Sequence, residues 1–225
     1  KALRSLRVYT PSEAAANFVR GQYGAGDDTH AYRNEDGVDP NSITETFVAA
    51  KLMFDNYRWS GVPFYVRTGK KLADKFTRID VVFKKPLIDI FANPRMKSEQ
   101  SLNSNVLTIF VEPNSGFSLR LNAKRAGQGF TTEPVDLKYL QSDEAKNESP
   151  EPYERLFHDA LEGNHTNFAS WAEIAYAWKF VDVIRKLWDI EEPQFPNYTP
   201  GSMGPAASDE LLARDGRQWV YHLNH

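Results

Sequence analysis

Residues 44–76 read TETFVAAKLMFDNYRWSGVPFYVRTGKKLADKF, and they predict the central part of the fold. Residues 46–55 are apolar on both alternating sets of positions, which is typical of a strand that is covered on both faces. The run NYRWSG predicts a turn, and residues 62–68 follow as a second strand. The chain then bends into a loop rich in lysine.

Further strand signals precede and follow this stretch, and helix signals dominate after residue 149. Residues 193–205 hold four prolines and two glycines, and we expect them to run over the surface. Residues 1–7 resemble the last turns of a helix. The other predicted strands are 18–23, 78–84, 105–112, 117–122, 135–139 and one around Trp219. The predicted helices are 153–161 behind a cap at Ser149 and Pro150, 171–189 behind a capping box of Ser170 and Glu173, and 209–214.

Strands first and helices last predict an α+β fold, with a large, mainly antiparallel β-sheet covered by helices. The segments between the elements are too short to mark a boundary. We therefore expect one domain over residues 1–225.

The composition is that of a globular protein without cysteine. The 225 residues are 41% hydrophobic and 13% aromatic, so a sizeable core can be buried without disulfides or a structural metal. The absence of cysteine excludes thiolate zinc sites and thiol nucleophiles, and it favours a cytoplasmic location. No stretch approaches the roughly 20 apolar residues of a membrane span. The net charge of −3 gives no indication of nucleic acid or an anionic membrane as a partner.

The histidines and glycines do not form a known motif. Of the five histidines, only His222 and His225 are close in sequence, and no carboxylate pattern completes a site, so we expect no metal. Gly24 and Gly26 follow a strand-like segment, as in a dinucleotide-binding loop. The third glycine of that motif is absent and two aspartates would face the pyrophosphate, so we predict an ordinary loop.

The end of the second strand carries the strongest candidate for a ligand site. Gly69 permits a bend that a side chain would obstruct, so Lys70 leaves from a fixed point at the strand end. Lys75 lies up to about 17 Å further along an extended chain. If the loop folds back, the two ammonium groups can converge on a small anion such as a sugar phosphate. The alternative that the residues leave open is that these lysines are merely solvated.

Four blocks of sequence, in this order and spacing, carry a family resemblance over nearly the whole chain. They are VRGQYGAG at 19–26, TETFVAAKLMFDNYRWSGVPFYVRTGKKL at 44–72, YERLFHDALEGN at 153–164 and GPAASDELLARDGRQW at 204–219. Together they resemble the C-terminal half of glucose-6-phosphate dehydrogenase, and RWSGVPFYVRTGKKL is the most specific part.

The resemblance implies a substrate and dimerisation domain of an enzyme that oxidises glucose 6-phosphate at C1 and passes hydride to NADP. This reaction opens the oxidative pentose phosphate pathway. In the family, an N-terminal Rossmann domain binds NADP, and the substrate site lies between it and the sheet domain. This chain resembles only the second domain, and the blocks that carry the catalytic groups of the family lie upstream of it. The resemblance therefore implies a cytoplasmic homodimer formed through the sheet domain, and a fragment that is inactive alone.

The resemblance also assigns Lys70 and Lys75 as substrate-binding residues, with a role in binding and not in proton transfer. Relatives that hold a second, structural NADP on this domain use Arg and Tyr where Phe110 and Ser118 stand, so we expect none here. Glu112 stands where relatives can carry Gln near the substrate, and its role stays open. Also open are the preference for NADP or NAD and a rival hypothesis, a stand-alone, non-catalytic binding or oligomerisation module of the same fold.

Overall fold

The computed structural model describes residues 2–85, 87, 103–127, 132–142, 144 and 151–221. The chain divides into two compact units, one of Lys1–Asp74 with His158–His225 and one of Lys75–Phe157. Helices and antiparallel sheets make up both, so the predicted α+β class is confirmed. The single domain remains a prediction, since compact units of this kind also occur within one domain. The predicted cap at Ser149 and Pro150, and the pair His222 and His225, lie outside the described residues.

The first unit is built on a three-stranded antiparallel sheet in the order β1-β2-β3. Its strands are β1 (Phe18–Gly21), β2 (Phe47–Met53) and β3 (Pro63–Gly69). The turn between β2 and β3 forms because the side-chain oxygen of Asn56 accepts the backbone N–H groups of Arg58 and Trp59, at 3.1 and 3.0 Å. The two strands and the turn of residues 46–68 are therefore confirmed.

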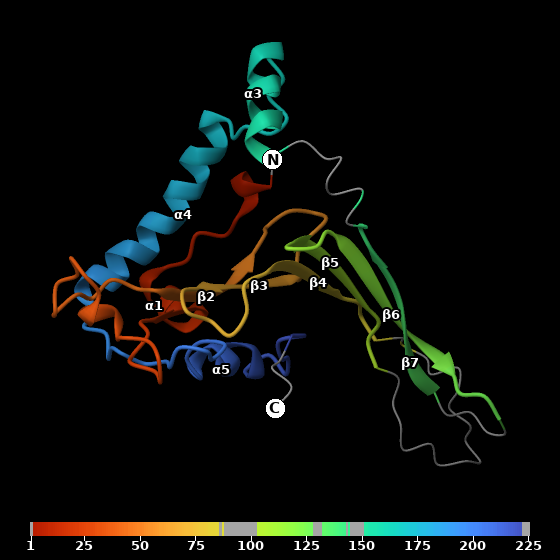
Figure 1. The fold of residues 1–225 in the computed structure, drawn as a ribbon, viewed down its shortest axis with the longest axis horizontal. Coiled ribbons are helices and arrows are strands. Elements are labelled where there is room, and N and C mark those ends of the chain that lie inside the picture. Colours follow the sequence, from red (N-terminus) through yellow and green to blue (C-terminus); the bar gives the residue numbers. More distant parts are fainter. Residues whose placement is uncertain are drawn as a thin grey trace. The chain divides into compact units, whose positions relative to one another are not determined.

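Both faces of this sheet are covered, as the alternation in β2 predicts. Ala50 packs in one core cluster with Tyr9, Phe18 and side chains of α4, and Ala49 packs in the other with Phe47, Tyr198 and side chains of α5. The helices are α1 (Pro11–Asn17), α4 (Trp171–Ile190) and α5 (Ala207–Ala213), and Figure 1 shows α4 and α5 on opposite sides of the strands. The sheet is thus the middle of three layers.

Two helices begin with the same capping arrangement, and only one of them was predicted. At α4, Ser170 and Glu173 each bind the other's backbone N–H, as expected. At α1, Thr10 and Glu13 do the same, although the sequence reading assigned no helix there. The remaining helical segments are α3 (Pro152–Glu162) and two short 3₁₀ helices, Leu3–Ser5 and Tyr32–Asn34.

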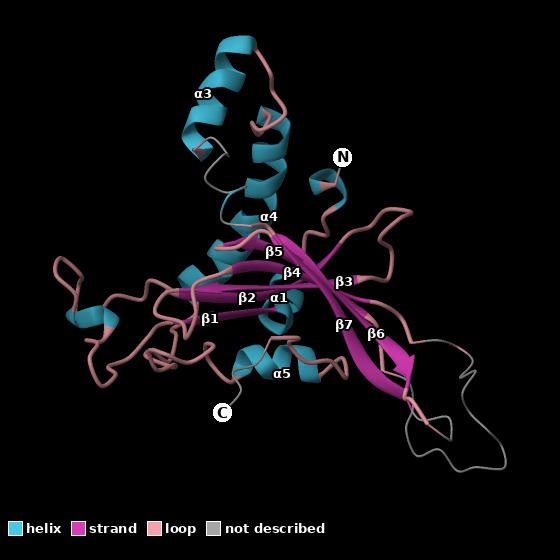
Figure 2. Ribbon diagram, turned by 45° about the vertical axis from the view of Figure 1, so that its right-hand side comes forward, coloured by secondary structure: helices cyan, strands magenta, loops and turns pink. Residues whose placement is uncertain are grey.

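The second unit contains a separate four-stranded antiparallel sheet in the order β4-β5-β6-β7, drawn in magenta in Figure 2. The strands are β4 (Thr77–Val82), β5 (Val106–Glu112), β6 (Gly116–Lys124) and β7 (Thr132–Leu140). The prediction of one large sheet was therefore wrong for the described residues, because β3 and β4 are edge strands of different sheets.

Two further predictions were wrong. Residues 217–221 form no strand around Trp219, whose ring instead packs against the side chain of Arg67. Nor is the segment 193–205 confined to the surface, since Tyr198 is 6% exposed and lies in the core.

Candidate functional site

Lys70 follows directly on the last residue of β3, and its position is fixed by the residues on either side. Its backbone N–H donates to the Thr46 carbonyl at 2.8 Å, which continues the pairing of β3 with β2. Gly69 must be a glycine here because a Cβ atom would lie 2.7 Å from Cδ2 of Phe47. The expectation that a side chain at 69 would obstruct the chain is thus confirmed, and the obstacle is the buried Phe47 ring.

The carbonyl of Lys70 is also held, by a residue 128 positions later in the chain. The Tyr198 hydroxyl donates to it at 2.9 Å and lies 2.9 Å from the Thr46 hydroxyl, from which it can accept. Burial raises the pKa of the Tyr198 hydroxyl, so this group keeps its proton in neutral solution. Both backbone groups of Lys70 are therefore bonded, whereas its side chain belongs to an exposed residue.

The rest of the loop is tied to the same distant segment. Lys71 has a φ of 52°, a left-handed backbone conformation that residues other than glycine rarely adopt. Its carbonyl accepts the N–H of Gly201 at 2.9 Å, and the N–H of Ala73 donates to the Ser202 carbonyl at 2.9 Å. At the end of the loop the Asp74 carboxylate accepts a hydrogen bond from the hydroxyl of Tyr221.

The two predicted site lysines belong to different compact units. Lys70 follows β3 in the first unit, and Lys75 is the first residue of the second. Both residues are exposed. The hydrogen bonds to Thr46 and Tyr198 fix the backbone of Lys70, and the convergence of the two ammonium groups stays a prediction.

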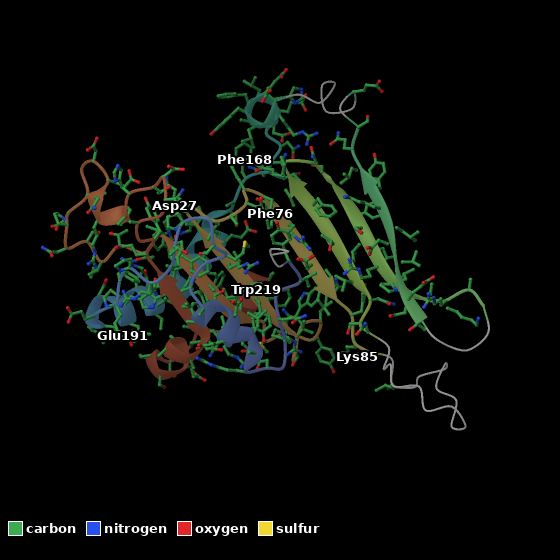
Figure 3. All side chains as sticks on the ribbon, turned by 60° about the horizontal axis from the view of Figure 1, so that its bottom comes forward. Asp27, Phe76, Lys85, Phe168, Glu191 and Trp219 are labelled. Carbon is green, nitrogen blue, oxygen red and sulfur yellow. The ribbon has the colours of Figure 1, made fainter. Side chains whose placement is uncertain are left out.

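The segment after α5 lies along β3 and brings further charged groups to it. The Arg67 guanidinium lies 4.4 Å from the ring of Trp219, which is labelled in Figure 3, and donates to the Tyr221 carbonyl at 2.9 Å. The Tyr65 hydroxyl donates to the Asp215 carboxylate, which also pairs with Lys51 at 2.6 Å. Burial, followed by the bond to Asp215, raises the pKa of Tyr65 to about 12.

Sequence reasoning missed Tyr198 and Tyr221 as partners of the lysine loop. Tyr198 stands among prolines and polar residues, and Tyr221 ends the short run of Trp219 and Val220, so neither belongs to a periodic pattern that could have indicated its contact. The available signal was the residue type, since a tyrosine combines a large apolar ring with a hydrogen-bonding group.

The loop at Gly24 and Gly26 does not fit a dinucleotide. A Cβ on Gly24 would lie 3.3 Å from Cγ of Pro196, and one on Gly26 would lie 3.3 Å from three atoms of the Pro200 ring. The N–H of Gly24 is also used, donating to the Tyr198 carbonyl at 2.8 Å. These glycines make room for prolines and leave no N–H cradle for a pyrophosphate, so the predicted ordinary loop is confirmed.

Two global features of the described residues bear on the site. Among the residues that the structure describes, no three His, Cys, Asp or Glu side chains gather in a way that could hold a metal ion. In the same part of the chain, no helix has both the length and the apolar character that crossing a membrane requires. Phe110 and Ser118 stand where relatives with a structural NADP carry Arg and Tyr. The ring of Phe110 lies 5.8 Å from the Arg78 guanidinium, and Ser118 pairs across the sheet with Thr108 and Lys138.

Comparison with known proteins identifies the family. The profile described as "Glucose-6-phosphate dehydrogenase, C-terminal domain" matches residues 1–220. The chain belongs to this family. Among curated relatives, it is 47% identical over 223 residues to glucose-6-phosphate 1-dehydrogenase of Bacillus subtilis, covering 97% of this chain and 45% of the relative. The corresponding protein of Leuconostoc mesenteroides is 45% identical over 222 residues, covering 98% of this chain and 44% of the relative.

Solved structures agree with this membership. A glucose-6-phosphate dehydrogenase in complex with its substrate glucose 6-phosphate superimposes with a TM-score of 0.82 and 28% identity, covering 98% of this chain and 44% of that one. The chain therefore spans less than half the length of the relatives that it matches.

Proposed function

We propose that this chain is the substrate-binding and assembly part of a glucose-6-phosphate 1-dehydrogenase, which oxidises D-glucose 6-phosphate to 6-phospho-D-glucono-1,5-lactone and reduces NADP. The family membership supports the reaction. The role in substrate binding is supported by the backbone of Lys70, whose N–H and carbonyl groups are both hydrogen-bonded directly after β3. A fixed backbone starts the flexible lysine side chain from a constant point, so its ammonium group can serve a defined anionic ligand.

In this proposal the chain contributes binding, and the chemistry of hydride transfer lies in the rest of the enzyme. Lys70 and Lys75 would contact the sugar phosphate and neutralise part of its charge. NADP would supply the hydride acceptor from a Rossmann domain, since the described glycine loop of this chain does not fit a dinucleotide. The cytoplasmic location is part of the same proposal, and cell fractionation would test it.

The decisive experiment substitutes Lys70→Ala in the complete enzyme. We expect the KM for glucose 6-phosphate to rise roughly ten- to hundredfold with kcat nearly kept, because one charge-assisted contact of about 1.5 to 3 kcal/mol is lost. Lys186→Ala, an exposed lysine on α4, is the control and should leave KM unchanged. A Lys70→Ala enzyme with wild-type KM would refute the assignment.

The homodimer is the second element of the proposal, and the sheet of the second unit supports it. One face of this sheet carries two rows of apolar side chains that are paired directly across the strands. Their members are Ile79, Ile109, Phe117 and Tyr139 in one row, and Val81, Leu107, Leu119 and Leu137 in the other. The first row is 38 to 57% exposed, which is unusual for so continuous an apolar surface on a lone subunit. We propose that a second copy of the chain covers this face.

A further inference from the structure

Tyr198 is a buried residue of the first unit that contacts the backbone of Lys70. Its ring is 6% exposed and packs 5.7 Å from the ring of Phe47 and 6.3 Å from that of Tyr23. Because the ring is enclosed, its hydroxyl has a constant position. That hydroxyl is the one that donates to the carbonyl of Lys70.

The peptide that follows Lys70 needs such a partner. Lys71 is the only described residue other than glycine with a positive φ, and a lysine in this conformation is disfavoured relative to the ordinary helical or extended regions. The carbonyl groups of Lys70 and Lys71 are held by Tyr198 and Gly201, three residues apart in one segment. Without these bonds the loop can relax toward a more favourable backbone, and Lys70 turns with it.

We infer that Tyr198 is a positioning residue for substrate binding, acting through the backbone of Lys70. It touches no substrate, and it improves affinity by keeping the lysine loop in the one conformation that presents Lys70. The inference rests on the proposed role of Lys70 and adds a residue from the proline-rich segment to the machinery of binding.

The test is Tyr198→Phe in the complete enzyme, which keeps the ring and removes only the hydroxyl. We expect the KM for glucose 6-phosphate to rise about three- to tenfold, the effect of one neutral hydrogen bond, while kcat changes less than about twofold. Tyr23→Phe is the matched control. Tyr23 is 5% exposed in the same core cluster, but its hydroxyl donates to Glu35 and not to the lysine loop, so its KM should stay at the wild-type value.

The double variant shows whether the effect passes through Lys70. If it does, Lys70→Ala with Tyr198→Phe has the same KM as Lys70→Ala alone, because the positioned group is already gone. Fully additive effects would overturn the inference. A Tyr198→Phe enzyme with wild-type KM beside a Lys70→Ala enzyme with raised KM would also overturn it, and would leave the proposed function standing. If Lys70→Ala has no effect, both fail.

Hydrogen exchange gives a readout that does not depend on catalysis. In Tyr198→Phe, the amides of Lys70 and Ala73, which are bonded to Thr46 and Ser202, should exchange faster than in the wild type and in Tyr23→Phe. Unchanged exchange of residues 68–74 in a folded Tyr198→Phe enzyme would show that the hydroxyl does not hold the loop.

Discussion

Arg20 illustrates how a single side chain can finish a helix from another element. It extends from β1, and its guanidinium donates to the carbonyls of Trp188 at 3.1 Å and Glu191 at 2.8 Å, at the C-terminal end of α4. Glu191 is labelled in Figure 3. The guanidinium also lies 5.4 Å from the ring of Trp188. A positive charge at this end opposes the negative end of the helix dipole and satisfies carbonyls that the helix leaves unpaired.

Replacing Arg20 by methionine should destabilise the fold. The apolar stem is kept, whereas two charge-assisted hydrogen bonds are lost, so we expect the free energy of unfolding to fall by about 1.5 to 3 kcal/mol in denaturant titration. Arg185→Met is the matched control on α4 itself, where the arginine pairs with Glu45 near the surface and the expected loss is below about 1 kcal/mol. Equal losses in the two variants would contradict the role of Arg20.

The helices and strands show which parts of this fold sequence patterns can reveal. The twenty-residue α4 was predicted because a capping box precedes a long amphipathic run. The helix α1 also begins with a capping box, but its seven residues are too few to show a helical period among the surrounding strand signals. A strand was predicted around Trp219 from a short apolar run. Such a run does not show whether the backbone can pair with a neighbouring strand.

Because Tyr65 bonds Asp215 in the contact between β3 and the segment after α5, the stability of the fold should fall at alkaline pH. The pKa of Tyr65 is about 12 in the folded chain, against 10.0 ordinarily. Since the folded chain holds this proton to higher pH than the unfolded chain, the stabilisation is complete below about pH 10 and is lost as the pH rises through about 12.

Denaturant titrations between pH 9 and 12 would measure this effect. The free energy of unfolding should fall less steeply with pH in Tyr65→Phe than in the wild type. Tyr57→Phe, at a fully exposed tyrosine, should follow the wild-type slope. Identical slopes for all three proteins would show that Tyr65 does not titrate differently in the folded state.

The division of the described strands into two sheets could not be predicted from sequence patterns. Alternation in each strand correctly indicated which residues share a face, as in Phe117, Leu119 and Leu121 on one side of β6. It carries no information about which strand is the neighbour, so β3 and β4 were placed in one sheet. For the candidate site, the strand end that precedes Lys70 was predictable, whereas the contact of Tyr198 was not, because it spans 128 residues without a repeating pattern.

The open apolar face of the second sheet makes a prediction for assembly. Phe117→Asp places a charge in the middle of that face and should shift the complete enzyme toward monomers at micromolar concentration in size-exclusion chromatography with light scattering. Ser118→Asp adds the same charge one residue along β6, on the opposite face, and should leave the dimer intact. A wild-type protein that is monomeric under these conditions would remove the dimer proposal.

The bonds between residues 70–74 and residues 198–221 also bear on synthesis. When β3 and the lysine loop have left the ribosome, Tyr198 and Tyr221, which bond the loop, have not yet been synthesised. The loop can reach its final geometry only when nearly the whole described chain has emerged. If Lys70 binds sugar phosphate as proposed, that affinity would be acquired late in synthesis, after the first three strands could already have paired.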